Sequence, residues 1–111
     1  MEKISIDEFA KLDLRVGEII EVALHPKADK LFVLKVDLNE GNMRTIVAGL
    51  REYYEVEELV GKKAIFVANL KPVMLRGVES NGMILAAVSS DKKEVVVLKP
   101  EKEIGNGTKI S

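Results

Sequence analysis

The alternation of apolar and polar side chains predicts that most of the chain is extended. The clearest case is residues 31–38, in which every second residue is apolar and is expected to face inward, while Lys35 and Asp37 face outward. Its inward set is Phe32, Leu34, Val36 and Leu38. In residues 13–25 one parity carries Leu14, Val16, Ile20, Val22 and Leu24. Glu18 interrupts that alternation directly after Gly17, which predicts a bulge or bend there. Further strands are expected at 43–50, 63–70, 83–88 and 94–100.

Two segments depart from the period of two and are expected to be short helices. Ser5 precedes residues 6–11 as an N-cap, and Glu8 follows it at the spacing of a capping box. Residues 51–61 show helical spacing of apolar side chains and end at Gly61, a natural helix stop. The expected connections are a turn at 39–42 and loops at 25–30 and 71–82.

The order of these elements is three strands, one helix and two further strands, which is typical of an OB-fold barrel. The chain is therefore expected to be all-β, a five-stranded barrel with its short helix between strands three and four. We expect one domain over residues 1–111, with the barrel at about 13–88 and a C-terminal extension at about 89–111. A β-sandwich built from the same strands stays open as an alternative.

The composition narrows the class of protein. The chain has 111 residues, 47% of them apolar, which is enough for one packed core. No apolar run has the roughly 20 residues of a membrane helix, so no membrane association is expected. The acidic N-terminal stretch lacks the apolar core of a signal peptide. The chain has no Cys, which excludes disulfides and thiolate metal sites and fits a reducing, cytoplasmic location.

A search for catalytic chemistry finds none. His25 is the only histidine, and beside Pro26 at a strand end it is expected to be a structural turn residue. No phosphate-binding glycine motif is present. The Glu57–Glu58 pair fits a solvated helix face. We expect no enzyme activity, no metal site and no cofactor.

The distribution of charge favours a binding role. The formal net charge of −1 argues against a strongly basic nucleic-acid binder, but residues 59–78 hold four bases and no acid, whereas residues 52–58 hold four glutamates. OB-folds bind nucleic acid across strands two and three and the two loops that rim them. The bases on these elements are Lys27, Lys30, Lys35, Arg44, Lys71 and Arg76. A local basic face is therefore expected, with the acidic helix elsewhere.

The scarcity of aromatic residues constrains the kind of nucleic acid. Proteins that capture single strands stack bases on aromatic side chains. Only five aromatics are present, and Phe32 and Phe66 are expected inside the barrel. This pattern favours recognition of a folded, duplex-like RNA by shape and backbone. Met74 and Met83 flank the long loop and are candidates for flexible apolar contacts.

Three stretches resemble one family: DLRVGEI (13–19), HPKADKLFVLKVDL (25–38) and VANLKPVMLRGVESNGMILAA (67–87). They resemble the tRNA-binding domain found as a free-standing dimeric protein and at the C-terminus of methionyl-tRNA synthetase. The resemblance covers essentially the whole chain, and the short chain beginning at Met1 is similar to the free-standing form or to a separately encoded synthetase subunit.

The resemblance implies structure-selective, largely sequence-independent binding of folded tRNA at its outer corner. It also implies a homodimer, with the extension at 89–111 contributing to the interface, and methionyl-tRNA synthetase as a candidate partner. The binding positions that it implies are Lys30, Lys71, Arg76, Ser80 and Met83. Weaker candidates are Lys27, Lys35, Arg44 and Asn81. Asn81 departs from the glutamine of many relatives, which alters a hydrogen-bonding position.

Two other functions stay open on the sequence. The first is a dimeric chaperone-like or secretion-related protein of the same fold, which would hold peptides on an apolar surface. The second is a dimerisation module without a ligand. The basic loops favour RNA binding over both.

Overall fold

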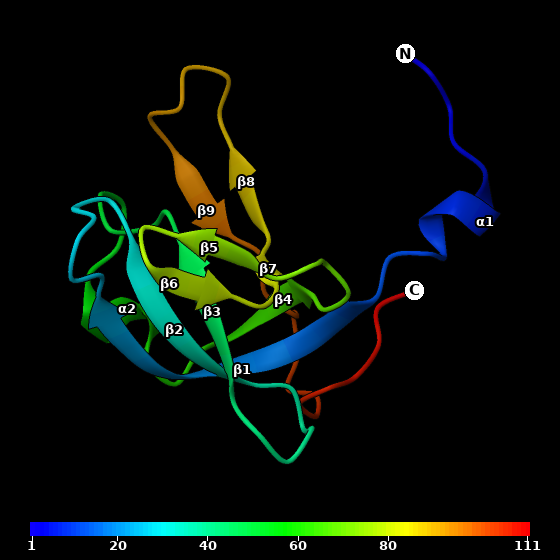
Figure 1. The fold of residues 1–111 in the computed structure, drawn as a ribbon. Coiled ribbons are helices and arrows are strands. Elements are labelled where there is room, and N and C mark those ends of the chain that lie inside the picture. The colour runs from blue at the N-terminus through cyan, green and yellow to red at the C-terminus, as the bar shows by residue number, and fades with distance from the viewer.

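A five-stranded antiparallel sheet curls into a barrel in the computed structural model, which describes residues 1–111 (Figure 1). The strands lie in the order β3-β2-β1-β4-β7, and β7 returns toward β3 to narrow the remaining gap. Their bounds are β1 (Leu14–Leu24), β2 (Phe32–Asp37), β3 (Arg44–Ala48), β4 (Lys63–Val67) and β7 (Met83–Ile84). The predicted all-β, OB-type barrel is confirmed, with a short helix between β3 and β4.

The long strand β1 organises the barrel because it pairs with two partners. Its first half, Leu14–Glu18, pairs with β4, and the part from Glu18 to Leu24 pairs with β2. The register with β2 shifts between Ile19 and Glu21, so the bulge lies at Ile20.

The position of this bulge corrects the inward set expected for β1. Ile19 is fully buried, whereas Ile20 and Leu24 are exposed. Gly17, where a bulge was expected, has a packing role instead. A Cβ at Gly17 would lie 2.7 Å from Leu38 and 2.8 Å from Phe66, so only glycine allows these side chains to pack against the strand.

The core fills the barrel with the inward side chains of β1, β2, β3 and β4. The alternation predicted for residues 31–38 is confirmed, because all four of its inward residues are buried. Phe66 of β4 and Ile46 of β3 complete the centre and are fully buried. Burial of each such side chain stabilises the fold by about 1.5–3 kcal/mol.

Both helices are shorter than predicted. Helix α1 (Ile6–Phe9) carries the expected capping box, in which the Glu8 amide donates to Ser5 Oγ at 3.1 Å and the Ser5 amide donates to Glu8 Oε1 at 3.2 Å. Helix α2 (Val56–Leu59) occupies only the end of the predicted 51–61 helix. The residues before it form turns at Leu50, whose carbonyl accepts from two successive tyrosine amides. Neither helix is long enough to cross a membrane.

The prediction of a loop at 71–82 is wrong, because this segment forms a hairpin of β5 (Val73–Leu75) and β6 (Val78–Ser80). The hairpin lies over the barrel and packs beside β3 (Figure 1). The alternation of apolar and polar residues in β5 and β6 is hard to recognise in the sequence, because both strands are short and because Pro72 and the Arg-Gly pair interrupt it.

The strand predicted at 83–88 is divided in two at Leu85. The first part is β7, and the second, β8 (Ala86–Val88), leaves the barrel and pairs with β9 (Val95–Val97). This second hairpin projects from the body (Figure 1). Leu85 stays attached at the division, because its amide donates to the Ile65 carbonyl at 2.9 Å and its carbonyl accepts from the Leu98 amide at 3.1 Å.

The C-terminal segment returns to the beginning of β1. The Val16 amide donates to the Thr108 carbonyl at 2.9 Å, the Gly107 amide donates to the Val16 carbonyl at 2.7 Å, and the Ile110 amide donates to the Leu14 carbonyl at 2.8 Å. The last residues therefore cover the edge of β1 that β4 does not pair with. Both chain ends lie on the same side of the molecule (Figure 1).

Candidate nucleic-acid interface

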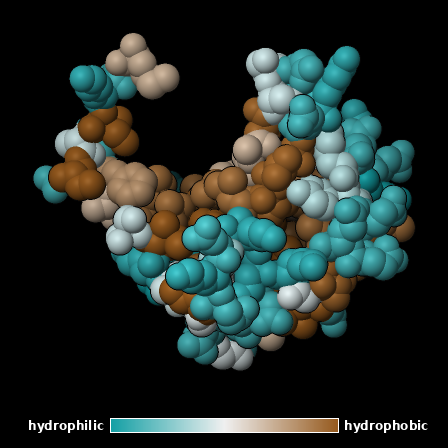
Figure 2. Space-filling view, turned by 180° about the vertical axis from the view of Figure 1, so that it is seen from behind, coloured by the Kyte–Doolittle hydropathy of each residue, from teal (hydrophilic) through white to brown (hydrophobic).

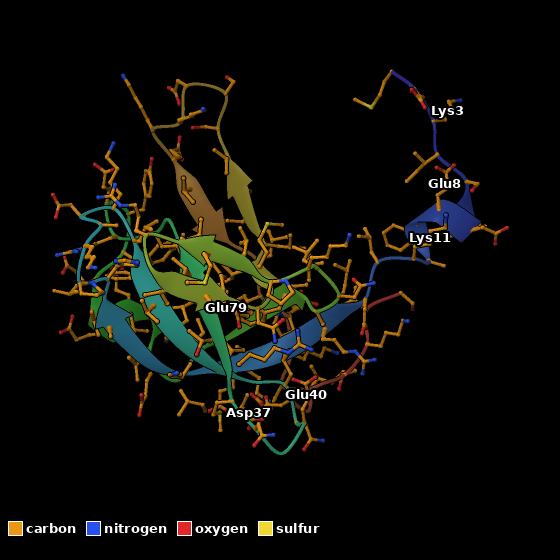
Figure 3. The ribbon with its side chains drawn as sticks, viewed as in Figure 1. Lys3, Glu8, Lys11, Asp37, Glu40 and Glu79 are labelled. Carbon is orange, nitrogen blue, oxygen red and sulfur yellow. The ribbon has the colours of Figure 1, made fainter.

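A groove of about 720 Å³ lies between the β2–β3 face and the β5–β6 hairpin. Its position agrees with the predicted ligand face of the OB-fold, but its charge is mixed. Lys35 and Arg44 contribute cations, and Glu40 and Glu79 contribute anions. Figure 3 shows Glu79 on β6 and Glu40 in the turn after β2. The full lining is Val33, Lys35, Glu40, Asn42, Met43, Arg44, Thr45, Gly77, Val78, Glu79 and Asn81.

Arg44 is committed to internal contacts. Its Nε and Nη2 donate to the two carboxylate oxygens of Glu40, each at 2.8 Å, and its Nη1 donates to the carbonyls of Ala68 and Asn81. The hydrogen bond from Arg44 lowers the pKa of Glu40 against the opposing effect of burial, and the same bond raises the pKa of Arg44. The charge of this weaker candidate is neutralised in place, so Arg44 braces the groove and is not a free phosphate contact.

Lys35 and Glu79 face the groove from opposite walls. Lys35 is exposed on β2, and its Nζ donates to Thr45 Oγ1 at 2.6 Å, which holds the ammonium over β3. Glu79 is exposed on β6 opposite Met74 and makes no ion pair or hydrogen bond through its carboxylate. The groove therefore offers both a donor and an acceptor to a bound molecule.

Arg76 stands at the tip of the β5–β6 hairpin. It forms a two-residue loop with Gly77, and both residues have positive φ, 52° and 91°, as a type I′ turn requires. Arg76 is exposed and has no ion-pair partner. The hairpin thus presents this guanidinium to solvent on a short, paired support.

Ser80 does not serve as an exposed contact residue. It is 2% exposed, its Oγ accepts from the Val47 amide at 2.9 Å, and its hydroxyl donates to the Gly82 carbonyl at 3.3 Å. Burial therefore corrects its expected contact with a phosphate or 2′-hydroxyl, and Ser80 anchors the base of the hairpin. Asn81 continues this anchor, because its amide donates to the Thr45 carbonyl at 2.8 Å.

Lys27 and Lys30 are exposed on the β1–β2 loop, and neither takes part in an ion pair. His25, at the start of the loop, is buried, as a structural turn residue would be. Arg51 supports the loop from behind, where its side chain donates to the Ala28 carbonyl and its amide to the Lys30 carbonyl. The tip of the β5–β6 hairpin lies beside the start of this loop, because His25 Nε2 lies 2.9 Å from the Leu75 carbonyl oxygen.

Lys71 and Met83 lie at the opposite end of the hairpin. Lys71 is exposed just before β5, and Met83 is 44% exposed where β7 pairs with Val67. Asn69 fixes this corner, because its side chain accepts from the Asp13 amide at 2.8 Å and donates to the Lys11 carbonyl at 2.6 Å. Five of the predicted residues thus form two exposed groups, with Lys27, Lys30 and Arg76 toward the hairpin tip and Lys71 and Met83 at its base, whereas Lys35 and Arg44 line the groove and Ser80 is buried.

The acidic helix is separate from this groove. Glu58 and Leu59 of α2 line another hollow, of about 700 Å³, together with the segment 96–103. No group of three or more His, Asp or Glu side chains is placed to hold a metal ion.

The sequence missed the two glutamates of the groove, Glu40 and Glu79. The position of Glu79 follows from the β5–β6 hairpin, which was expected to be a loop, whereas Glu40 lies in the turn predicted at 39–42. The available signal for this hairpin is Gly77 between two short apolar runs, since glycine readily adopts the positive φ of a type I′ turn, but Arg76 is not a residue that favours the first position of such a turn.

Residues 14–109 match the family model described as "Putative tRNA binding domain". Methionine–tRNA ligases share this segment. The ligase of Pyrococcus horikoshii is 56% identical over 110 residues, and that of Deinococcus radiodurans is 50% identical over 107. The alignments cover 99% and 96% of this chain but only 15% of each ligase.

Solved structures agree with this match over the full length. A MetRS-related protein from Pyrococcus horikoshii has a TM-score of 0.93 at 39% identity, with both chains covered completely. The chaperone CsaA from Bacillus anthracis has a TM-score of 0.88 at 31% identity and covers 99% of this chain and 100% of its own.

Proposed function

The chain belongs to the tRNA-binding domain family, and on this premise we propose that it binds folded tRNA by shape and backbone, with little dependence on base sequence. The observation that carries the proposal is the paired hairpin that holds Arg76, free of any ion pair, next to the start of the loop that carries Lys27 and Lys30. Guanidinium and ammonium groups bind phosphates and displace condensed counterions. Lys71 extends these contacts at the base of the hairpin.

The remaining groups limit how the RNA is read. Phe32 and Phe66 are buried in the barrel, so neither is a platform for stacked bases. Met74 and Met83 are exposed at the hairpin and supply apolar contacts to sugars or bases. Glu79 repels phosphates from the groove itself, which leaves the backbone of the RNA on the rim and directs hydroxyl or amino donors to the carboxylate.

We further propose that the chain serves methionyl-tRNA synthesis, either as a separate protein or as part of a ligase. The support is its 56% identity to a segment of a methionine–tRNA ligase. Such a module adds tRNA affinity and raises the effective concentration of tRNA at a catalytic site. A role in methionyl-tRNA synthesis agrees with the cytoplasmic location expected from the sequence.

A salt titration of tRNA binding tests the main proposal. Fluorescence anisotropy with folded tRNA at two salt concentrations is expected to show affinity that falls steeply as salt increases. Heat-unfolded tRNA of the same sequence is the matched control and is expected to bind more weakly. Equal affinity for both forms would contradict recognition by shape, and no binding to either would contradict the function.

We propose that the chain forms a homodimer through the apolar face that lies between the N-terminal arm, residues 1–12, and the β8–β9 hairpin. Figure 2 shows apolar side chains lining the hollow between these two projections. The arm buries no residue of α1, although Ile4 and Ile6 are 62% and 77% exposed. The hairpin exposes Val88 and Val96 on its two opposite faces, because Val88 pairs with Val95 and Val96 pairs with Ala87, and both side chains are more than half exposed. A second copy of the chain would cover both sets of side chains.

A peptide-holding role is the second candidate, because a chaperone, CsaA, shares the fold and the same hollow is apolar. The two uses of the hollow differ in oligomeric state. If the chain is a dimer closed over this face, unfolded peptides have no access to it. Suppression of aggregation by a monomer that binds no tRNA would favour the chaperone role.

A further inference from the structure

His25 is one of the two polar or charged residues that the fold buries, with 3% of its surface exposed. A buried polar side chain must find hydrogen-bond partners, since an unpaired one destabilises the fold. Both ring nitrogens of His25 have such partners. Nδ1 lies 3.0 Å from the Lys27 amide nitrogen, and Nε2 lies 2.9 Å from the Leu75 carbonyl oxygen.

These partners fix the protonation of the ring. The Lys27 amide can only donate, so Nδ1 must accept and carries no proton. The Leu75 carbonyl can only accept, so Nε2 must donate. The imidazole is therefore the neutral Nε2–H tautomer, and both of its hydrogen bonds are to backbone groups.

The two partners belong to different parts of the site. Lys27 lies in the loop that carries Lys30, and Leu75 directly precedes Arg76 at the tip of the hairpin. The β5–β6 hairpin pairs with no other strand, and its base is held through Ser80 and the residue after it. Toward the tip, in residues 74–78, the bond from His25 is the only hydrogen bond to the rest of the chain.

We propose that His25 is a positioning residue for tRNA binding, which ties the hairpin tip to the β1–β2 loop so that Arg76 and the lysines of the loop engage one stretch of RNA backbone together. The proposal rests on the function proposed above. Fixing the three cations before binding lowers the conformational entropy lost in the complex. Without the tie, the hairpin tip moves independently and Arg76 contributes little to affinity.

Two substitutions separate the two hydrogen bonds. Asparagine places an acceptor near the position of Nδ1 but does not reach Leu75, whereas glutamine places an amide donor near the position of Nε2. His25→Asn is expected to weaken tRNA binding by about three- to tenfold and to lower the log–log salt slope by about one, as loss of one phosphate contact does. His25→Gln is expected to retain most of the affinity.

A double-mutant cycle tests whether His25 acts through Arg76. Arg76→Ala removes the guanidinium directly, so adding His25→Asn to it is expected to weaken binding by less than about twofold further. Tyr53→Phe is the matched control, since it removes a hydrogen bond of 3.0 Å from a side chain to the Lys92 carbonyl, outside the proposed interface. Its tRNA affinity and salt slope are expected to equal those of the wild type.

The outcomes distinguish this proposal from the function on which it rests. If the wild type binds no tRNA, both fail. Two outcomes with a wild type that binds tRNA would overturn the positioning role of His25 while the function stands. In one, His25→Asn and Arg76→Ala weaken binding by independent factors that multiply in the double mutant. In the other, His25→Asn leaves the salt slope unchanged.

Nitrogen NMR of the wild-type ring provides a measurement that does not depend on the folding of a variant. The expected spectrum shows one tautomer, protonated at Nε2. A ring protonated at Nδ1, or exchanging between tautomers, would overturn the tie whatever the variants do.

Discussion

At the scale of single residues, close contacts and internal charge pairs decide which side chains are free. Because Gly17 has no Cβ, the side chains of Phe66 and Leu38 can pack directly against β1. Glu40 forms an ion pair with the guanidinium of Arg44, so a base that the sequence places on the predicted ligand face is not free to pair with a phosphate. Exposure and partners, which depend on distant segments, therefore separate functional cations from structural ones.

Gly17→Ala is expected to destabilise the protein by about 1–3 kcal/mol, because its Cβ would press on Phe66 and Leu38 in the filled core. Urea unfolding followed by circular dichroism measures this change. Gly49→Ala is the control, since the nearest atom to a Cβ there is a Leu31 methyl at 3.9 Å. Equal stabilities of the two variants would show that the contact at Gly17 is not restrictive.

Glu40→Gln is expected to change both stability at low pH and tRNA affinity. The bond from Arg44 lowers the folded pKa of Glu40 below its ordinary value of 4.5, so its contribution to stability is present above that value and is lost as pH falls through the folded pKa. The variant lacks this part of the acid transition. It also releases the charge of Arg44 into the groove, so its affinity for tRNA is expected to rise. Thermal melts from pH 3 to 7, with anisotropy at pH 7, are the measurements, and an unchanged acid transition would exclude the pair as its source.

At the scale of elements, the β5–β6 hairpin is the part of the fold on which the proposed binding surface depends. Its tip carries Arg76 and its inner face contributes Ser80 to the anchor. The groove exists only because the hairpin lies over β3, so the orientation of this one element determines the geometry of the site.

Arg76→Ala is expected to weaken binding of different tRNAs by similar factors and to lower the salt slope by about one, since a phosphate contact carries no base information. Fluorescence titrations with two tRNA species at several salt concentrations measure both quantities. Lys92→Ala is a suitable control, because Lys92 also has a positive φ, 61°, at an exposed turn outside the interface. Loss of discrimination between tRNAs in Arg76→Ala would contradict a phosphate role.

The sequence predicts the elements that have strong local patterns and misses those fixed by contacts across the chain. Strand β2 and the capping box of α1 follow from alternation and from residue type. The bulge at Ile20 does not, because register is decided by how β1 pairs with two partners. Likewise, five of the six bases of the expected interface are exposed as predicted, whereas buried Ser80 bonds to the Val47 amide, 33 residues away.

At the scale of the whole molecule, the N-terminal arm and the β8–β9 hairpin lie on either side of the apolar hollow. The cations of the proposed interface lie elsewhere, on the barrel and the β5–β6 hairpin. Lys3, Glu8 and Lys11 lie on the N-terminal arm, apart from the groove (Figure 3). A dimer closed over the hollow would leave the hairpin tips of both copies accessible to RNA.

Val96→Asp is expected to convert the proposed dimer into a monomer, since it places an unpaired charge in the apolar contact. Sedimentation velocity measures the change. Val60→Asp is the matched control, because Val60 is 43% exposed beside α2 and Val96 is 53% exposed. A wild type that sediments as a monomer would contradict the dimer, and dissociation of both variants would contradict this choice of interface.

The return of the C-terminal segment to β1 has a consequence for synthesis. The Val16 amide donates to the Thr108 carbonyl and the Val16 carbonyl accepts from the Gly107 amide, so one edge of β1 is completed only when residues that follow β9 have been translated. Until then the nascent chain carries an open strand edge, the kind of surface on which chains associate wrongly. Completion of this strand edge therefore waits for residues 107–110, and a chain that stalls before residue 107 leaves the edge of β1 unpaired.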